Sequence, residues 1–258
     1  MANIIVCGAD GRMGRTIIQL ANADSDINVV GAVEIDSSPA IGMGKPIITK
    51  SSEMERIVNK GDIIVDFTVA SNTIKNLEIA VKKGALMVIG TTGLNNEHKD
   101  ILQNASKKIP IVTSPNMSIG INILIDLVEN LAKKMSGYDV EIVELHHNKK
   151  KDAPSGTAIR LAEAAAKGME KDLKKDGVYG RHGTDALRTP GEIGVHAVRG
   201  GDIVGEHTIY FIGIGERIEI SHKASSRENL ASGALKASKW IADKPAGLYD
   251  MRDVLGLK

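Results

Sequence analysis

The chain of 258 residues carries 33 basic and 32 acidic side chains, so its formal net charge at neutral pH is +1. This length can bury the core of one large domain or of two modest ones. The balanced charge gives no basic surface of the kind that attracts nucleic acids or anionic membranes. Only two Phe, four Tyr and one Trp could stack on bases. The composition therefore predicts a globular protein with a small-molecule partner, which binds neither nucleic acid nor membrane.

The sequence contains no pattern typical of a targeting or membrane segment. No apolar run reaches the roughly 18 residues that a membrane-spanning helix needs, and the start, MANIIVCGADG, lacks the charged and apolar regions of a signal peptide. We therefore expect a cytoplasmic protein. The single cysteine, Cys7, lies in an apolar run and is expected to be a buried packing residue without a chemical role.

Short apolar runs alternate with helical segments over about the first 115 residues. Segments such as 73–83 and 96–107 have helical periodicity and suit right-handed crossovers between parallel strands. Runs that are apolar on both faces indicate a parallel sheet covered by helices. The expected strands are NIIVCG, INVVGAVE, DIIVDFT, ALMVIGTTG and IPIVTS. The pattern predicts a doubly wound α/β domain.

The pattern changes after a helix expected over about residues 119–135. YDVEIVELHH alternates as a strand does, and a helix is expected from about Ser155. The segment EIGVHAVRGGDIVGEHTIYFIGIGERIEISH is typical of consecutive antiparallel strands, with glycine turns at 199–202 and 213–216. It predicts an α+β domain with a mostly antiparallel open sheet.

The last 32 residues return to an Ala-rich helical pattern that could pack on the first domain. We therefore expect two domains. Residues 1–117 and 227–258 would form a dinucleotide-binding domain, and residues 118–226 a domain for substrate binding and oligomerisation.

A glycine-rich loop, GADGRMG, follows the first strand and contains Gly8, Gly11 and Gly14. Without side chains there, backbone amides at a helix start can approach a pyrophosphate. The second strand ends at Glu34, 20 residues after Gly14, where a carboxylate could accept hydrogen bonds from an adenosine ribose. No Lys or Arg follows, so we expect NADH to be preferred over NADPH or equally accepted. Because glycines also permit close helix packing, a loop without a cofactor remains an alternative.

The segment HHNKKKDAPSGTA, residues 146–158, joins titratable side chains to a predicted helix start. Ser155 can cap the helix, and the amides of the next two residues can hold a carboxylate. His146 can act as an acid or base near neutrality, and Lys150 can pair with a carboxylate or deliver a proton. A solvated loop after a strand is the alternative that spacing alone leaves open.

Residues 144–158 resemble the signature of the 4-hydroxy-tetrahydrodipicolinate reductases, also called dihydrodipicolinate reductases, of lysine and diaminopimelate biosynthesis. The family pattern E-x-H-x-x-x-K-x-D-x-P-S-G-T-A is matched at every defined position. Further family features appear in order over essentially the whole chain: DFT, GTTG, SPNMSIG, RTPGEIG, RGGDIVGEHT, IGERIEISHKASSR and GLYDM. The resemblance implies a Rossmann-like first domain and reduction of 4-hydroxy-tetrahydrodipicolinate to tetrahydrodipicolinate with NAD(P)H.

The resemblance also implies roles for the residues that match family positions. His146 and Lys150 would be catalytic, with Lys150 the expected proton donor. The substrate's carboxylates would be bound by His147, Ser155, Gly156 and Thr157. The ribose contact would be Glu34, the pyrophosphate loop Gly8, Ala9, Asp10, Gly11, Arg12 and Met13, and the segments beside the nicotinamide Gly90, Thr91, Thr92, Ser114, Pro115, Asn116 and Met117.

Two positions depart from the family pattern. Ile35 replaces an arginine that some members use for the NADPH phosphate, which puts a preference for NADPH in doubt. Met117 stands where many members carry phenylalanine, and it should alter only the packing near the nicotinamide.

The implied substrate is a cyclic dicarboxylate that loses water from its 4-hydroxyl, accepts a hydride at C4 and gains a proton at the neighbouring carbon. The implied assembly is a homotetramer, and the sheet of the second domain is an expected surface for self-association. Three alternatives remain: a metal site among the histidines, a regulatory dinucleotide-binding module, and a dehydrogenase for another carboxylate. No His-x-x-x-His pair or Cys cluster is present, so no metal is expected.

Overall fold

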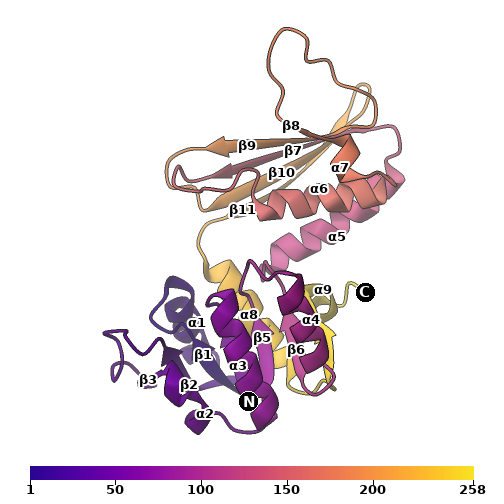
Figure 1. Ribbon diagram of the computed structural model, residues 1–258. Helices are drawn as coiled ribbons and strands as arrows, with labels where there is room; N and C mark the ends of the chain where they lie inside the picture. The colour runs from indigo at the N-terminus through magenta and orange to yellow at the C-terminus, as the bar shows by residue number, and fades with distance from the viewer. The chain divides into compact units, whose positions relative to one another are not determined.

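The computed structural model describes residues 1–258, which form two compact units. Unit 1 comprises Met1–Ile119 and Arg227–Lys258, and unit 2 comprises Gly120–Ser226. In Figure 1 the C-terminal segment, drawn in yellow, lies within the same unit as the N-terminal strands. None of the helices combines the length and apolar character required to cross a membrane.

Unit 1 is built on a parallel sheet of seven strands in the order β12-β6-β5-β4-β1-β2-β3. The strands are β1 Ala2–Cys7, β2 Ile27–Glu34, β3 Ile48–Lys50, β4 Ile63–Asp66, β5 Leu86–Ile89, β6 Pro110–Thr113 and β12 Gly247–Tyr249. All five predicted strands are confirmed. The strand order reverses between β1 and β4, the switch point beside which doubly wound sheets bind ligands at their carboxyl ends.

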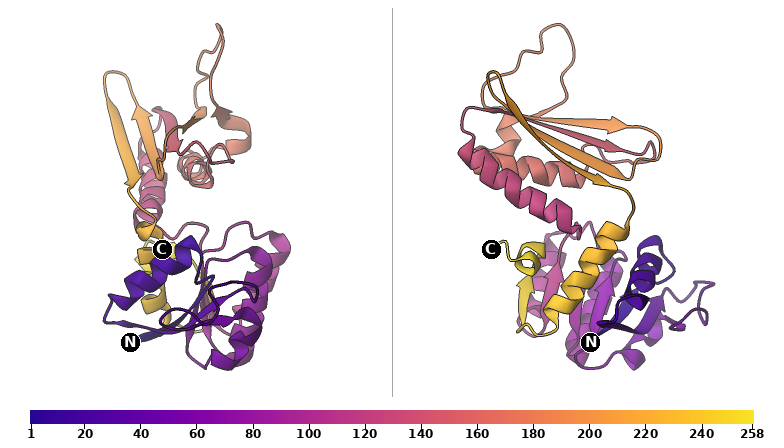
Figure 2. Two further views of the ribbon diagram at one scale, coloured as in Figure 1. Left: turned by 90° about the vertical axis from the view of Figure 1, so that its left-hand side faces the viewer. Right: turned by 180° about the vertical axis from the view of Figure 1, so that it is seen from behind.

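Helices cover both faces of this sheet (Figures 1 and 2). They are α1 Arg12–Asn22, α2 Met54–Ile57, α3 Ala70–Lys83, α4 Asn96–Ala105, α8 Glu228–Ile241 and α9 Met251–Leu255, with a 3-10 turn at Ser51–Glu53. Alternate residues of β1 enter the two cores: Ile4 and Val6 pack with α1, α8 and α9, whereas Ile5 and Cys7 pack with α2, α3 and α4. Cys7 is buried, as expected.

Unit 2 has a mixed sheet of five strands in the order β11-β10-β7-β9-β8. Its elements are α5 Ile119–Lys134, β7 Asp139–His146, α6 Gly156–Gly168, α7 Leu173–Asp176, β8 Gly177–Tyr179, β9 Ile193–Arg199, β10 Gly205–Ile212 and β11 Arg217–Ala224. Helices α5 and α6 cover one face of the sheet (Figure 1). Every second residue of β7 is buried, and Val140 and Ile142 pack in this core.

One pairing differs from the sequence-based expectation. Strands β10 and β11 form the predicted antiparallel hairpin, but β9 does not pair with β10. Strand β7 lies between them, antiparallel to β10 and parallel to β9. The turn predicted at 199–202 therefore crosses the end of β7, where Gly200 donates a hydrogen bond to the carbonyl of His146 (2.9 Å). The alternating pattern identified these strands correctly, but it could not show that β7 separates them.

Candidate active site

The glycine loop of unit 1 joins β1 to α1. Gly8 has a φ of +73°, in the left-handed region that favours glycine. A Cβ on Gly14 would lie 2.1 Å from the carbonyl oxygen of Gly8, so the start of α1 approaches the end of β1 this closely only because Gly14 has no side chain. The amides of Gly8 and Ala9 donate to the carbonyl of Val33 (2.9 and 3.1 Å), which fixes the loop against β2.

The start of α1 is the part of this loop best suited to an anion. Gly11 is the N-cap and provides no side-chain hydrogen bond to the helix. Because the first N–H groups of a helix have no acceptor within it, the amides of Arg12 and Met13 face the same end as the positive pole of the helix dipole. This arrangement fits a pyrophosphate at the position that the sequence predicts.

The Glu34 carboxylate, at the end of β2, lies beside the glycine loop. It accepts hydrogen bonds from the backbone N–H of Asp10 (3.0 Å) and of Ile35 (2.9 Å). The side chain is thus held beside the glycine loop, where an acidic residue can meet a ribose hydroxyl. The fit to a dinucleotide is therefore good at both the pyrophosphate and the ribose.

A small cavity of about 100 Å³ lies beside Glu34. Its walls include Gly8, Ile35 and, from α3, Asn72 and Lys75. Lys75 is exposed. The residues directly after Glu34 give no sign of this cation, because Lys75 lies on α3, 41 positions after Glu34 in the chain.

The two segments expected beside the nicotinamide follow β5 and β6 at the carboxyl edge of the sheet. A cavity of about 560 Å³ is lined there by Thr91, Thr92 and Pro115, together with residues of α4. This volume lies within the usual range of ligand pockets. The remaining predicted positions, Gly90, Ser114, Asn116 and Met117, are not among its lining residues.

Met117 is 1% exposed and packs in the core with α8. A Cβ on Gly233 of α8 would lie 1.8 Å from the carbonyl oxygen of Met117, so helix and loop are in close contact. The structure therefore assigns the Met117 side chain a packing position.

In unit 2, the end of β7 brings two titratable side chains to the helix-covered face of the sheet. Glu144 and His146 are two residues apart and therefore point the same way, and they are 0% and 9% exposed. The Nδ1 atom of His146 lies 2.5 Å from the Oε2 atom of Glu144. Burial lowers the pKa of His146, and the hydrogen bond with Glu144 opposes this effect.

Arg199 ends β9 and stands opposite His146 in the parallel register. Its guanidinium donates to both carboxylate oxygens of Glu144 (2.9 and 2.7 Å) and to the carbonyl of Asp152 (2.7 Å). Burial disfavours the ionised form of Glu144. Hydrogen bonds from Arg199, from His146 and from the Ser155 amide nevertheless hold the pKa of Glu144 below its usual range.

The start of α6 lies against the same carboxylate. The Ser155 amide donates to Oε1 of Glu144 (3.0 Å), while the Ser155 hydroxyl caps the helix by accepting from the Ala158 amide (3.2 Å). A Cβ on Gly156 would meet no atom within 4 Å, so space is open beside the helix start. The predicted N-cap is confirmed, and the first amides of α6, at Gly156 and Thr157, are at the end of a helix that favours a carboxylate.

Lys150 lies in the loop between β7 and α6. Its Nζ atom donates to both carboxylate oxygens of Asp152 (2.9 Å each), and its side chain is 20% exposed. The hydrogen bond from Lys150 holds the pKa of Asp152 below its usual range. The charge of Lys150 also lowers the pKa of His146, although less than burial does.

His147 follows β7 directly. Its backbone N–H donates to the carbonyl of Ile203 (2.8 Å), in the connection that crosses the end of β7. The Nδ1 atom of its ring is buried and makes no hydrogen bond. A buried nitrogen without a partner is uncommon in proteins, so the His147 ring has one hydrogen-bonding position that the chain itself does not fill.

A further histidine, His207 of β10, completes this group. Its ring meets that of His146 edge to face, with centroids 5.2 Å apart, and its Nε2 atom lies 3.1 Å from the Ser155 hydroxyl. Burial, followed by the nearby charge of His146, lowers the pKa of His207 to about 4. The ring is therefore neutral near physiological pH.

The structure thus brings His146 and Ser155 to the carboxylate of Glu144, with Lys150 near enough for its charge to act on His146. Four further residues lie in this group, although the sequence indicated no role for them: Glu144, Asp152, Arg199 and His207. The alternation of β7 could have indicated Glu144, two positions before His146. Arg199 and His207 each lie more than 50 positions after Glu144 in the sequence. Only the strand register brings them to the site. His, Cys, Asp and Glu side chains nowhere gather in a group of three or more that could hold a metal ion.

The fold of unit 1 and its glycine loop, joined in one chain to the buried acid–base group of unit 2, define the class of dinucleotide-dependent oxidoreductases. Family models described as dihydrodipicolinate reductase match residues 2–117 (N-terminus) and 120–255 (C-terminus). The protein belongs to the dihydrodipicolinate reductase family.

Individual relatives agree with this assignment. The chain is 45% identical over 267 residues to the 4-hydroxy-tetrahydrodipicolinate reductase of Syntrophotalea carbinolica, with 100% of both chains covered. It is 46% identical to the enzyme of the same name from Trichlorobacter lovleyi, again over 100% of both chains. Among solved structures, dipicolinate-bound dihydrodipicolinate reductase from Paenisporosarcina sp. TG-14 has the same fold, with a TM-score of 0.76, 21% identity and 97% of each chain covered.

Proposed function

We propose that this protein reduces 4-hydroxy-tetrahydrodipicolinate, through loss of water to dihydrodipicolinate, to tetrahydrodipicolinate with NAD(P)H in lysine and diaminopimelate biosynthesis. The observation that carries this proposal is the group of side chains at the start of α6. There a buried His146, a nearby Lys150 and the capped helix end offer an acid–base pair beside a site for carboxylates. The family assignment supplies the identity of the dicarboxylate.

In this proposal the chain's own residues bind the substrate through its two carboxylates. The amides of Gly156 and Thr157, the Ser155 hydroxyl and the ring of His147 hold them, since a helix N-terminus favours negative charge. Lys150 delivers the proton to the carbon next to C4, and His146 assists as an acid or base. Lys150 must leave Asp152 to do so, because both carboxylate oxygens of Asp152 accept hydrogen bonds from its Nζ atom.

Unit 1 would hold the cofactor. The first amides of α1 would bind the pyrophosphate, Glu34 the adenosine ribose, and the segments after β5 and β6 the nicotinamide end. When bound, the reduced nicotinamide supplies the hydride. The positions of Glu34 and Ile35 support NADH as the preferred or equally accepted form, because a carboxylate at the ribose repels a 2'-phosphate. Lys75 in the same cavity wall supports the acceptance of NADPH as well.

The proposal extends to assembly and compartment: we propose a cytoplasmic homotetramer. The face of the unit 2 sheet opposite α5 and α6 carries no helix, and it exposes Val198 (45%) and Ile212 (36%) beside polar side chains. An uncovered sheet face of this kind can be buried against a second copy. Light scattering on the purified chain measures the mass of the assembly. A mass of four chains is expected, and a monomer would contradict this part of the proposal.

The activity is tested by adding purified protein and NADH to the product of condensing aspartate-semialdehyde with pyruvate. We expect NADH oxidation that depends on that product. His146→Gln should lower kcat/KM by about 10²-fold or more, since general acid–base catalysis contributes about 10²- to 10⁴-fold. His182→Gln, which changes an exposed histidine outside the site, is the matched control and should leave the rate unchanged. Absence of substrate-dependent oxidation would contradict the proposed function.

A further inference from the structure

The Glu144 carboxylate lies at the centre of the unit 2 site, although it has no assigned role in the reaction. It is 0% exposed, and it receives four hydrogen bonds: two from Arg199, one from the ring of His146 and one from the Ser155 amide. A buried carboxylate is costly unless it is paired and fully hydrogen-bonded. Here each of its hydrogen bonds reaches an element of the proposed site.

We propose that the ion pair of Glu144 and Arg199 is the positioning unit of this site. It holds the His146 ring, the carboxylate-binding start of α6 and the Lys150 loop in one arrangement. This inference rests on the proposed function for its catalytic consequence. Neither residue touches the reacting atoms in this account, so both act through the residues that they hold.

The first consequence is a fixed orientation for His146. Because the Glu144 carboxylate only accepts hydrogen bonds, Nδ1 of His146 carries the proton between them. The opposite edge of the ring lies close to Gly205, where an added Cβ would be 2.9 Å from Nε2 of His146. The imidazole is thus oriented through Nδ1, and its Nε2 atom is the one available for proton exchange.

The second consequence is that the Lys150 loop is tied to the same carboxylate. Arg199 donates one hydrogen bond to the carbonyl of Asp152 while it pairs with Glu144. Asp152 in turn holds the Nζ atom of Lys150. One guanidinium therefore connects the residue that orients His146 with the residue that holds Lys150.

The charged and titratable groups that face His146 come from several elements. Glu144 shares β7, Arg199 is on β9, His207 is on β10 and Lys150 is in the following loop. Burial lowers the pKa of His146 most, Glu144 raises it, and Lys150 and Arg199 lower it further. Loss of the negative charge of Glu144 therefore removes the one opposing contribution, and His146 should then titrate at lower pH.

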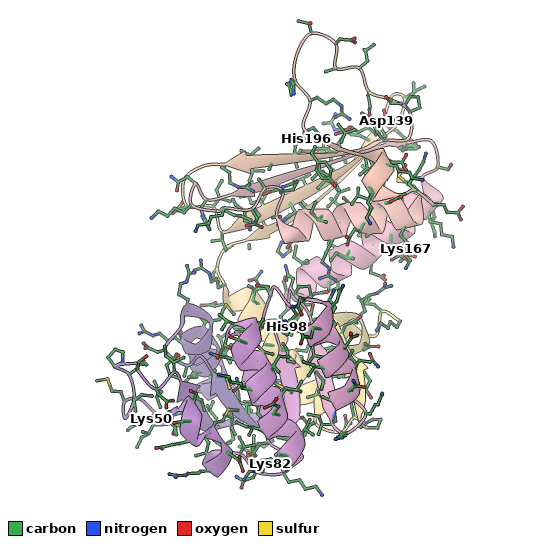
Figure 3. The ribbon with its side chains drawn as sticks, viewed as in Figure 1. Lys50, Lys82, His98, Asp139, Lys167 and His196 are labelled. Carbon is green, nitrogen blue, oxygen red and sulfur yellow. The ribbon has the colours of Figure 1, made fainter.

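The test compares Glu144→Gln with a control from the same strand. Glu141 accepts hydrogen bonds from two arginines, Arg181 and Arg188, and lies 2.7 Å from the ring of His196. Its side chain is on the face of the sheet opposite the site. Figure 3 labels His196, a member of this second cluster, on the sheet of unit 2. Glu141→Gln thus removes the same kind of charge from the same strand without touching His146.

Two readouts are measured on each variant. The first is the titration of His146 in protein labelled with ¹⁵N-histidine, with its signals assigned by their loss in His146→Gln. The second is the pH profile of kcat/KM. For Glu144→Gln we expect both to move to lower pH, with kcat/KM about 10- to 100-fold lower at its optimum, because displaced catalytic groups cost rates of this order. For Glu141→Gln neither should move.

A second substitution covers the case in which Glu144→Gln fails to fold. Arg199→Lys keeps a positive charge beside Glu144 but lacks the rigid planar fork with which Arg199 reaches both carboxylate oxygens and the Asp152 carbonyl at once. It should raise KM and lower kcat while the melting temperature remains close to that of the wild type. The proposal is overturned if Arg199→Lys has wild-type kinetics, or if Glu144→Gln leaves both the titration and the profile in place.

The proposed function and this inference fail in different ways. If the wild type does not oxidise NADH with the condensation product, the proposed function is wrong. The titration of His146 still decides the positioning role in that case. A His146 titration that moves in Glu144→Gln but not in Glu141→Gln supports the positioning role. Equal His146 titrations in the wild type and both variants overturn it.

Discussion

The Ser155 hydroxyl lies 3.1 Å from Nε2 of His207 and accepts the Ala158 amide at the same time. A hydroxyl can donate one hydrogen bond and accept two, so the direction of its hydrogen bond with His207 follows the tautomer of the ring. The Nδ1 atom on the other side of the ring is buried and makes no hydrogen bond. The cap of α6 thus packs against a histidine that is buried and, near physiological pH, neutral.

The burial of His207 predicts a loss of stability in mild acid. Burial lowers the pKa of His207 to about 4, whereas an unfolded histidine titrates near 6.5. Between these values the unfolded chain binds more protons than the folded one, so this contribution to the free energy of unfolding is complete above pH 6.5 and falls as the pH drops toward 4. At pH 4.5 the loss should be about 2.5 kcal/mol.

Urea unfolding of the wild type and of His207→Gln at pH 7.5 and pH 4.5 measures this contribution. The glutamine can form a hydrogen bond with the Ser155 hydroxyl but does not titrate. Its free energy of unfolding should therefore fall less between the two pH values than that of the wild type. Equal losses in the two proteins would show that His207 is not the responsible group.

Alanine variants of two helix caps distinguish an effect on substrate binding from an effect on stability. Ser155 caps α6 in the proposed site, and Asp250 caps α9 in unit 1. Substitution of either by Ala should cost about 1 kcal/mol of stability, the usual contribution of an N-cap. Only Ser155→Ala should also raise KM for the substrate, because only α6 is proposed to bind carboxylates. An equal KM for the substrate in both variants would show that Ser155 does not bind the substrate.

The sequence predicted the unit 1 sheet well because its strands are apolar on both faces and each is followed by a helix. The pattern that predicts β1 also predicts its place in the centre of a parallel sheet. It missed β3 and β12, which have three residues each and lie at the two edges. Such short edge strands bury little apolar surface and so leave little pattern in the sequence.

The site in unit 2 was predictable only where its residues are close in sequence. His146, Lys150 and Ser155 lie within ten positions, and the cap and loop between them are local structure. Arg199 reaches Glu144 because β9 pairs with β7, and the sequence instead favoured a hairpin of β9 with β10. Strand order is a tertiary property that no local periodicity encodes, so the ion pair could not be predicted.

Glu34 should determine how well the protein binds NADH. Its carboxylate is held by the Asp10 amide at the position proposed for the ribose. Glu34→Gln should weaken NADH binding about 5- to 10-fold by the loss of charge-assisted hydrogen bonds. NADPH binding should weaken less or improve, because the repulsion of its 2'-phosphate disappears. The quenching of cofactor fluorescence gives both dissociation constants. A wild type that strongly prefers NADPH would contradict our interpretation of Glu34 and Ile35.

Lys150 and the site around it are proposed to carry out the reduction, and the three consecutive lysines allow a direct test. Lys149 and Lys151 are exposed, so their alanine variants are matched controls. The measurement is kcat/KM for NADH oxidation with the condensation product of aspartate-semialdehyde and pyruvate. Lys150→Ala should lower it by about 10²- to 10⁴-fold, with both controls near the wild-type value. A Lys150→Ala variant within a few-fold of the wild type would contradict the claim.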